Sequence, residues 1–113
     1  MAKYLENFVT DFVTISNGTT TSNAVDLQGR GLLAIILPAA FTGSAITFQI
    51  SVNNSTFFAV YNTANSQLSM TVTQGRAYAF DPSDLLCARY LKLVSGSSEG
   101  ADRVITLISR VLE

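Results

Sequence analysis

The chain has 113 residues, the length of a single domain, and carries a formal net charge of −1 with only 13% charged residues. A globular domain typically has about 25% charged residues, so the polar surface of this one must come largely from its 12 Ser, 12 Thr and 7 Asn. This composition excludes a disordered chain, a coiled coil and a charged helical bundle. The seven cations are spread singly along the chain, which argues against a nucleic-acid partner bound through its phosphates.

Missing residue types limit the chemistry further. There is no His, and Cys87 is the only cysteine, so the commonest general base, a cysteine zinc site and an intramolecular disulfide are all excluded. The longest apolar run, residues 31–41, contains Pro38 and is shorter than the about 20 residues that span a bilayer. Residues 1–9 lack the apolar region of a signal peptide. We expect a protein made in the cytoplasm, with no membrane partner, metal or cofactor.

The first part of the chain predicts strands separated by turns. Residues 8–15 are β-branched and aromatic and predict a strand, and the polar residues 16–23 predict a turn. A short strand is expected at 24–27, followed by a bend where two glycines flank Arg30. Residues 32–37 form a continuous apolar run, which is typical of a central strand buried on both faces.

Alternation of apolar and polar residues marks the middle of the chain. Residues 45–52 place apolar side chains at the even positions from 46 onward and polar ones between them, which predicts a strand with one buried face. A turn at 53–56 returns the chain as a partner strand at 57–61. Residues 68–72 repeat the alternation, and another short strand is expected at 77–80.

The last third predicts one helical turn and two further strands. In residues 81–86, Asp81 is placed as the N-cap and is followed by Pro, which is favoured at the first helical position. Strands are expected at 88–95 and 103–112, with a flexible loop at 96–100 between them. About eight short strands and no long helix predict an all-β domain, a two-sheet antiparallel β-sandwich of jelly-roll type.

Two features of the sequence could support catalysis, and each has a structural explanation. Asp81 and Asp84 suit general acid–base chemistry or a cation site, but capping of the predicted helical turn explains their spacing. Cys87 has no His to activate it as a nucleophile, so we expect a small core residue. The five arginines stand singly in the sequence and are expected to be solvated or paired locally. We therefore expect no catalytic residue and no enzymatic activity.

Aromatic residues are the candidates for an interaction surface. Phe57 and Phe58 are neighbours in a predicted strand, and neighbouring strand residues point to opposite faces, so one of them must face away from the core. Such a side chain either anchors a protein interface or stacks on a sugar, or a loop or adjacent strand covers it. The full set of candidate interface residues is Tyr4, Phe8, Phe12, Phe57, Phe58 and Tyr61.

Three segments carry a likeness to a known family, in the order TISNGTTTSNAVDLQGRGLLAIILPAAFTGSAITFQISVNNSTF (14–57), DPSDLLCARYLKLVSG (81–96) and ADRVITLISRVL (101–112). With them the chain resembles a family of small virion structural proteins of tailed bacteriophages. The hairpin that begins at Phe48 and the ARYLKL segment also resemble the core of discoidin-type, galactose-binding-like jelly rolls, as an analogy of fold alone. Residues 1–13 match least well and would form an N-terminal arm or the first strand of a single domain spanning 1–113.

The phage resemblance implies a structural role without catalytic residues. It implies a decoration or cement protein on the outside of the phage head, bound to the major capsid protein and commonly assembled as a homotrimer. We expect this location on the virion and this function. The alternatives are a carbohydrate-binding module of a tail or fibre, against which the absence of Trp argues, and a head–tail joining or tail protein.

Overall fold

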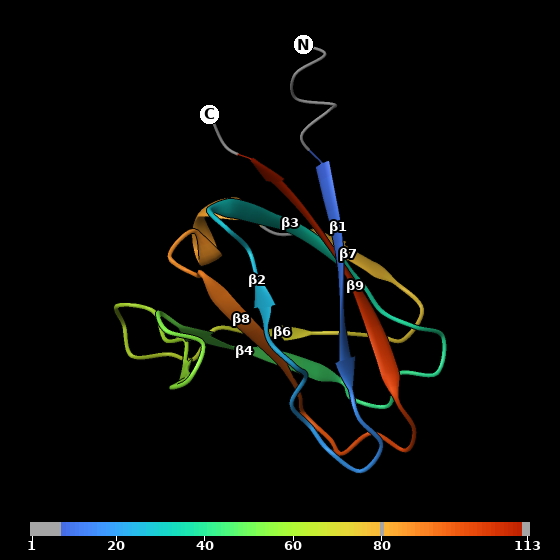
Figure 1. Cartoon of the computed structure of the whole chain (residues 1–113). Coiled ribbons are helices and arrows are strands. Elements are labelled where there is room, and N and C mark those ends of the chain that lie inside the picture. The colour runs from blue at the N-terminus through green and yellow to red at the C-terminus, as the bar shows by residue number, and fades with distance from the viewer. Residues whose placement is uncertain (1–7, 80, 112–113) are drawn as a thin grey trace.

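The computed structural model describes residues 8–79 and 81–111, which form two antiparallel sheets packed face to face (Figure 1). The four-stranded sheet has the order β1-β9-β3-β7, made of Phe8–Ile15, Arg103–Val111, Arg30–Ile36 and Ala77–Ala79. The five-stranded sheet has the order β2-β8-β4-β5, with β6 also paired to β4, and is made of Val25–Asp26, Tyr90–Ser95, Ala45–Ser51, Phe58–Ala59 and Ser69–Thr71.

The connectivity is that of a jelly roll. Strand β8 pairs with β4 along the whole of Ile46–Ser51, so β5 and β6 must share the other edge of β4 and together occupy one position in the sheet. Counted this way, consecutive strands change sheet at every step except from β4 to the β5–β6 position, and the two sheet orders are those of a jelly roll built from two Greek keys. The predicted all-β sandwich of jelly-roll type is therefore confirmed.

The core lies between the two sheets and follows the predicted alternation. In β9, Ile105 and Leu107 are fully buried while Val104 is half exposed, and in β4 Ile46 and Phe48 are buried. Burying each such side chain stabilises the fold by about 1.5–3 kcal/mol. The buried hydrophobic residues are Val13, Ile15, Val25, Leu27, Leu32, Ile35, Leu37, Phe41, Ile46, Phe48, Val72, Leu85, Ala88, Leu91, Leu93, Ile105 and Leu107.

The predicted turns are present with the expected chemistry. Gly18 has a positive φ of 80° in the turn after β1, a conformation that glycine adopts without steric cost. Pro82–Leu85 forms a short 3-10 helix (η1), and the Asp81 carboxylate caps it by accepting from the Ser83 amide. Within the described ranges 8–79 and 81–111, no helix is long and apolar enough to cross a membrane.

Three details of the predicted strands are wrong. Strand β3 is central in its sheet but is not buried on both faces, because no described element covers the outer side, where Ile36 is exposed. Val52 was expected to point inward but is 89% exposed, since β4 ends at Ser51. The expected strand at 57–61 is shortened to β5, Phe58–Ala59, after which the Val60 amide still donates to Phe48 O of β4.

The N-terminal segment was expected to form either an arm or the first strand, and residues 8–15 form a strand. They form β1, which pairs with β9 over its full length, so this part of the segment is the first strand of the sandwich. Tyr4 and the other residues before Phe8 lie outside the described residues.

Candidate functional site

The outer face of the four-stranded sheet gathers several exposed apolar side chains. Its members follow from the register, because directly opposed residues of paired strands share a face. Val13 and Ile15 of β1 point into the core, so the alternate residues point outward. The outer apolar face consists of Phe8, Thr10, Phe12, Thr14, Ala34, Ile36, Ala77, Ala79, Val104, Thr106, Ile108 and Arg110.

Large side chains on the outer apolar face are well exposed. Phe12 is 61% exposed, Val104 49%, Phe8 47% and Ile36 39%. A contiguous exposed apolar surface of this kind is uncommon on a soluble monomer and typically marks an interaction site. The face is therefore the first candidate for a protein interface.

A single charged side chain, Arg110, lies on the outer apolar face. Its guanidinium carbon stands 3.9 Å from the centroid of the Phe8 ring, directly across from it in the register. Its Nε is buried and has no hydrogen-bond partner. A guanidinium stacked on an aromatic ring keeps its charge with less hydration than a free ammonium, so this cation interrupts the apolar character of the face very little.

The outer face of the five-stranded sheet is different, because it is polar. The register places Thr47 and Gln49 of β4 beside Val94 and Lys92 of β8. Lys92 Nζ lies 4.3 Å from the centroid of the Phe57 ring. The two outer faces therefore divide the surface into an apolar side and a hydroxyl- and amide-rich side.

Phe57 and Phe58 point to opposite faces, and Phe57 is the one that faces away from the core, because its ring lies against Lys92 on the outer face. Phe58 is opposite Ile50 and so lies on the core side of the sheet, but it is 65% exposed at the open edge there. Tyr61 is 54% exposed near Phe58. Phe58 and Tyr61 therefore belong to one site and Phe8 and Phe12 to another, so the described candidates do not form a single surface.

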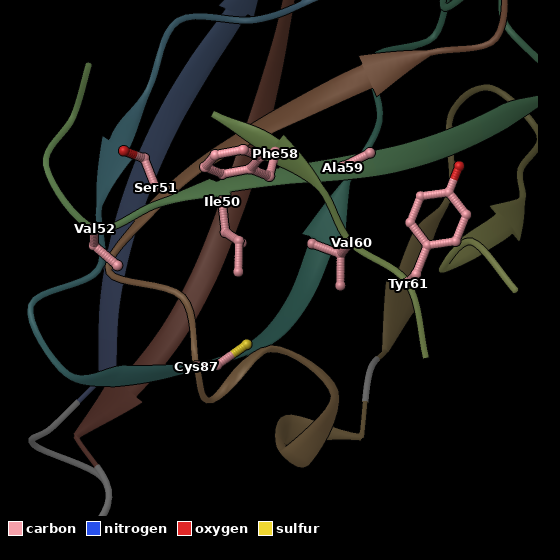
Figure 2. Close-up of a pocket in the computed structure, with 8 residues that line it drawn as sticks. All are labelled: Ile50, Ser51, Val52, Phe58, Ala59, Val60, Tyr61 and Cys87. Atoms are coloured by element: carbon pink, nitrogen blue, oxygen red, sulfur yellow. The ribbon is translucent and has the colours of Figure 1, made fainter. Parts of the chain in front are cut away.

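Phe58 and Tyr61 line a pocket of about 320 Å³ at the β5 edge of the sandwich (Figure 2). The side chains of Ile50 and Val60 point toward Cys87 across this pocket. The lining consists of Ile50, Ser51, Val52, Phe58, Ala59, Val60, Tyr61 and Cys87. A pocket of this size with mostly apolar walls is at the small end of ligand sites.

Cys87 was predicted to be a core residue, and this prediction is wrong. The 3-10 turn η1 and its continuation bury Leu85 and Ala88, which are joined by the hydrogen bond from Ala88 N to Leu85 O of 3.0 Å. The intervening Cys87 is turned outward and exposed. Leu85 and Ala88 are three positions apart, the spacing of one helical turn, so the sequence did indicate that these two residues share the buried face. Cys87 is placed outside only if the turn continues beyond residue 86, where the prediction ended it.

Asp81 has the capping role that the sequence predicted for it, and Asp84 lies in the first turn of η1. The Asp81 carboxylate accepts hydrogen bonds from the Ser83 hydroxyl at 2.8 Å and the Ser83 amide at 3.0 Å. These two bonds lower the pKa of Asp81 below its ordinary value. Among the residues that the structure describes, no group of three or more His, Cys, Asp or Glu side chains is placed to hold a metal ion.

A buried carboxylate that the sequence did not single out lies at the end of the sandwich where β1 turns toward β2. Glu99 is 1% exposed, although residues 96–100 were expected to be a flexible loop. Its Oε1 accepts from the Thr42 amide at 2.8 Å and from Arg103 Nε at 3.0 Å. Its Oε2 accepts from the Gly43 amide at 3.0 Å and from Ser95 Oγ at 2.8 Å. Both carboxylate oxygens are thus fully satisfied.

Glu99 ties together three chain segments that are far apart in sequence. Its own backbone amide donates to Thr19 O, and its carbonyl accepts from the Gly18 amide. A side chain at Gly43 would collide with Ser95 Oγ, so only glycine allows the loop to approach this closely. We call Glu99, with its partners Thr42, Gly43, Ser95 and Arg103, the Glu99 clamp.

Opposing effects act on the ionisation of Glu99. Burial by itself would raise its pKa, but the bonds from the Thr42 amide, Ser95, Arg103 and the Gly43 amide together favour the carboxylate. The net result is a pKa below the ordinary value. At neutral pH Glu99 is therefore an ionised carboxylate with a structural role, and it does not serve as a proton donor.

Local pairing of the arginines, as predicted, is confirmed for three of them. Arg30 meets Asp11 at 2.7 Å, Arg89 meets Asp26 at 3.3 Å, and Arg103 meets Glu99 at 3.0 Å. These pairs lie at the ends and margins of the sandwich rather than on the outer apolar face.

Comparison with known proteins gives a likeness in structure but none in sequence. No protein-family model matches the chain, and no curated protein matches its sequence. The structure is similar to the crystal structure of YomS, a protein derived from the SPBc2 prophage, with a TM-score of 0.57 over 90% of this chain and 93% of that one. Since the sequence identity is 13%, this likeness establishes a shared fold.

Proposed function

We propose that the protein is a non-enzymatic structural component of a tailed-phage virion and that it decorates the outside of the head. The observation that carries this proposal is the outer apolar face. A broad face with a single, ring-stacked cation fits a second protein surface better than it fits water or a charged ligand.

The fold and the sequence support the same role. The fold is shared with a prophage-derived protein, and the segments at 14–57, 81–96 and 101–112 resemble phage virion structural proteins. On this proposal the major capsid protein is the partner, and the protein reaches the virion after synthesis in the host cytoplasm.

The outer apolar face would contribute to binding mainly by burial. Phe12, Val104 and Ile36 are held on paired strands, so little conformational entropy is lost when a partner covers them. Thr106, beside Phe12, retains a hydroxyl that can bond to a partner or to trapped water. The chemistry of the proposed function is therefore attachment, with no bond made or broken.

Copy number in the particle tests the proposed function. Virions of the phage that encodes the chain would be purified and their proteins quantified by mass spectrometry with labelled peptide standards. A decoration protein should be present in numbers comparable with the major capsid protein. Absence of the chain from the particle would overturn the decoration role. A count of only a few copies per particle would also overturn it and would favour a head–tail or tail protein.

The aromatic pocket favours a second candidate, a carbohydrate-binding module of a tail or fibre. Phe58 and Tyr61 are exposed at its wall, and aromatic side chains there are suited to stack on an apolar sugar face. The polar atoms that would orient a sugar are few, namely those of Ser51, Tyr61 and Cys87. A glycan array would test it: binding that Tyr61→Ala abolishes supports this candidate, and no binding to any glycan rejects it.

A further inference from the structure

The strands at the edges of the two sheets differ greatly in length. Strand β1 has 8 residues, whereas the other edge strands, β2, β5, β6 and β7, have only 2 or 3. Short edge strands are one means by which proteins avoid strand addition. Strand β1 lacks most of the usual protection, since it contains no Pro, Gly or Lys and pairs with β9 without a bulge. Its inward-pointing charge, Asp11, is paired with Arg30, and residues 22–23 cover only its end at Thr14 and Ile15.

The free side of β1 carries unpaired backbone groups. The Thr14 amide donates to Asn23 Oδ1 at 2.7 Å and its carbonyl accepts from the Asn23 amide at 3.3 Å, so these groups point away from β9. Alternate residues of a strand direct their backbone groups to the same side. The amides and carbonyls of Phe8, Thr10 and Phe12 therefore point to the same free edge, where no described residue bonds to them.

We propose that β1 pairs with β1 of a second copy of this chain, antiparallel about a two-fold axis at Thr10. Thr10 then faces its own counterpart, and Phe8 of each copy faces Phe12 of the other. Aromatic pairs opposed in this way stabilise strand pairing. The pairing joins the two four-stranded sheets into one continuous sheet.

Charge makes a second copy the occupant that suits this edge. Within residues 8–12 the only charged side chain is Asp11, which points to the inner side and already meets Arg30 of its own chain at 2.7 Å. In the proposed register Asp11 faces Val9 of the other copy, so no like charges are directly opposed. The segment is thus complementary to itself in both side-chain type and charge.

A two-fold pairing accounts for a dimer rather than the trimer that the phage resemblance implies. A ring of three would need β1 to pair with a different edge, and the other edges offer only 2 or 3 residues. The dimer would also set two outer apolar faces side by side. The inference goes beyond the proposed function and holds whether or not the protein binds a capsid.

A charge-swap experiment on the full chain tests the pairing. Thr10→Lys places two ammonium groups opposite each other at the axis, and Thr10→Glu places two carboxylates there. Sedimentation velocity should show a dimer for the wild type and a monomer for each variant alone. An equimolar mixture of the two variants should form a heterodimer that dissociates at high salt. Thr71→Lys, on the exposed edge strand β6, is the matched control and should remain a dimer.

Two further measurements separate lost pairing from lost folding. Thermal unfolding followed by circular dichroism should show that both variants remain folded, and amide exchange at Phe8, Thr10 and Phe12 should slow as the wild-type concentration rises. A wild-type monomer at every concentration, a trimer, or a dimer that Thr10→Lys leaves intact would overturn the proposal. Its failure is distinct from that of the decoration role, which is judged by copy number in the virion.

Discussion

At the scale of single residues, Glu99 is the side chain that connects the loops at one end of the sandwich. Its carboxylate is buried and accepts four hydrogen bonds from three chain segments. Removing one partner of a buried, hydrogen-bonded ion pair leaves the other uncompensated. The clamp therefore fixes the relative positions of the loops at this end.

Glu99→Ala is expected to destabilise the protein by about 3–5 kcal/mol, because Arg103 and the amides of Thr42 and Gly43 lose their acceptor. Urea unfolding followed by tyrosine fluorescence measures the change. Asp84→Ala, which removes an exposed carboxylate, is the control and should stay within about 0.5 kcal/mol of wild type. Equal stability of the two variants would show that the clamp does not stabilise the fold.

The pH dependence of stability follows from the lowered pKa of Glu99. A carboxyl whose folded pKa lies below its ordinary value of 4.5 contributes fully above that value and loses its contribution as pH falls through the folded pKa. Wild-type urea midpoints should therefore decline below about pH 4.5 more steeply than those of Glu99→Gln. Identical slopes for the two proteins would contradict this role.

At the scale of elements, alternation of side chains predicted most of the sandwich. Residues 45–51 became a strand with the expected buried face, because its even-numbered positions are all apolar. The strand expected at 103–112 is present as β9. The turn at Gly18 and the cap at Asp81 were also predicted, since each depends only on neighbouring residues.

What the sequence could not predict depends on contacts between distant segments. The burial of Glu99 requires Thr42 and Gly43 to approach from 57 and 56 positions away, and no local pattern records this. The exposure of Ile36 depends on whether anything covers the outer side of its sheet. Gathering Phe58 and Tyr61 beside Cys87 likewise depends on how the two sheets meet at one edge.

The loop between β5 and β6 provides a test at the scale of elements. The Asn62 Oδ1 accepts from the amides of Ala64 at 2.9 Å and Ser66 at 3.0 Å, so it holds the projecting loop closed. Asn62→Ala should cost about 1 kcal/mol locally and speed amide exchange at those two positions. Asn65→Gly is the control, because Asn65 has a φ of 61° that glycine adopts freely. Unchanged exchange at Ala64 and Ser66 in Asn62→Ala would rule this role out.

At the scale of the whole molecule, the few charged side chains are distributed unevenly over the surface. The ion pairs of Arg30, Arg89 and Arg103 lie at the ends and margins of the sandwich, and Arg110 alone occupies the outer apolar face. Ser and Thr supply much of the remaining polarity, as the composition indicated. This division leaves one broad face suited to contact with another protein.

Val104→Lys separates binding by this face from folding. Val104 is 49% exposed at the outer apolar face, so the variant should unfold within about 0.5 kcal/mol of wild type. We expect it to lose cosedimentation with phage heads that lack the protein, because its ammonium would be desolvated against the partner. Thr71→Lys, on the other sheet, should cosediment as wild type does, and a Val104→Lys variant that still binds heads would place the contact elsewhere.

The most direct test of the account is a cryo-electron microscopy map of the virion that encodes this chain. The account predicts jelly-roll density on the outside of the head, with Phe12, Ile36 and Val104 turned toward the shell. Density confined to the tail, or a head-bound subunit whose outer apolar face is turned to solvent, would contradict it.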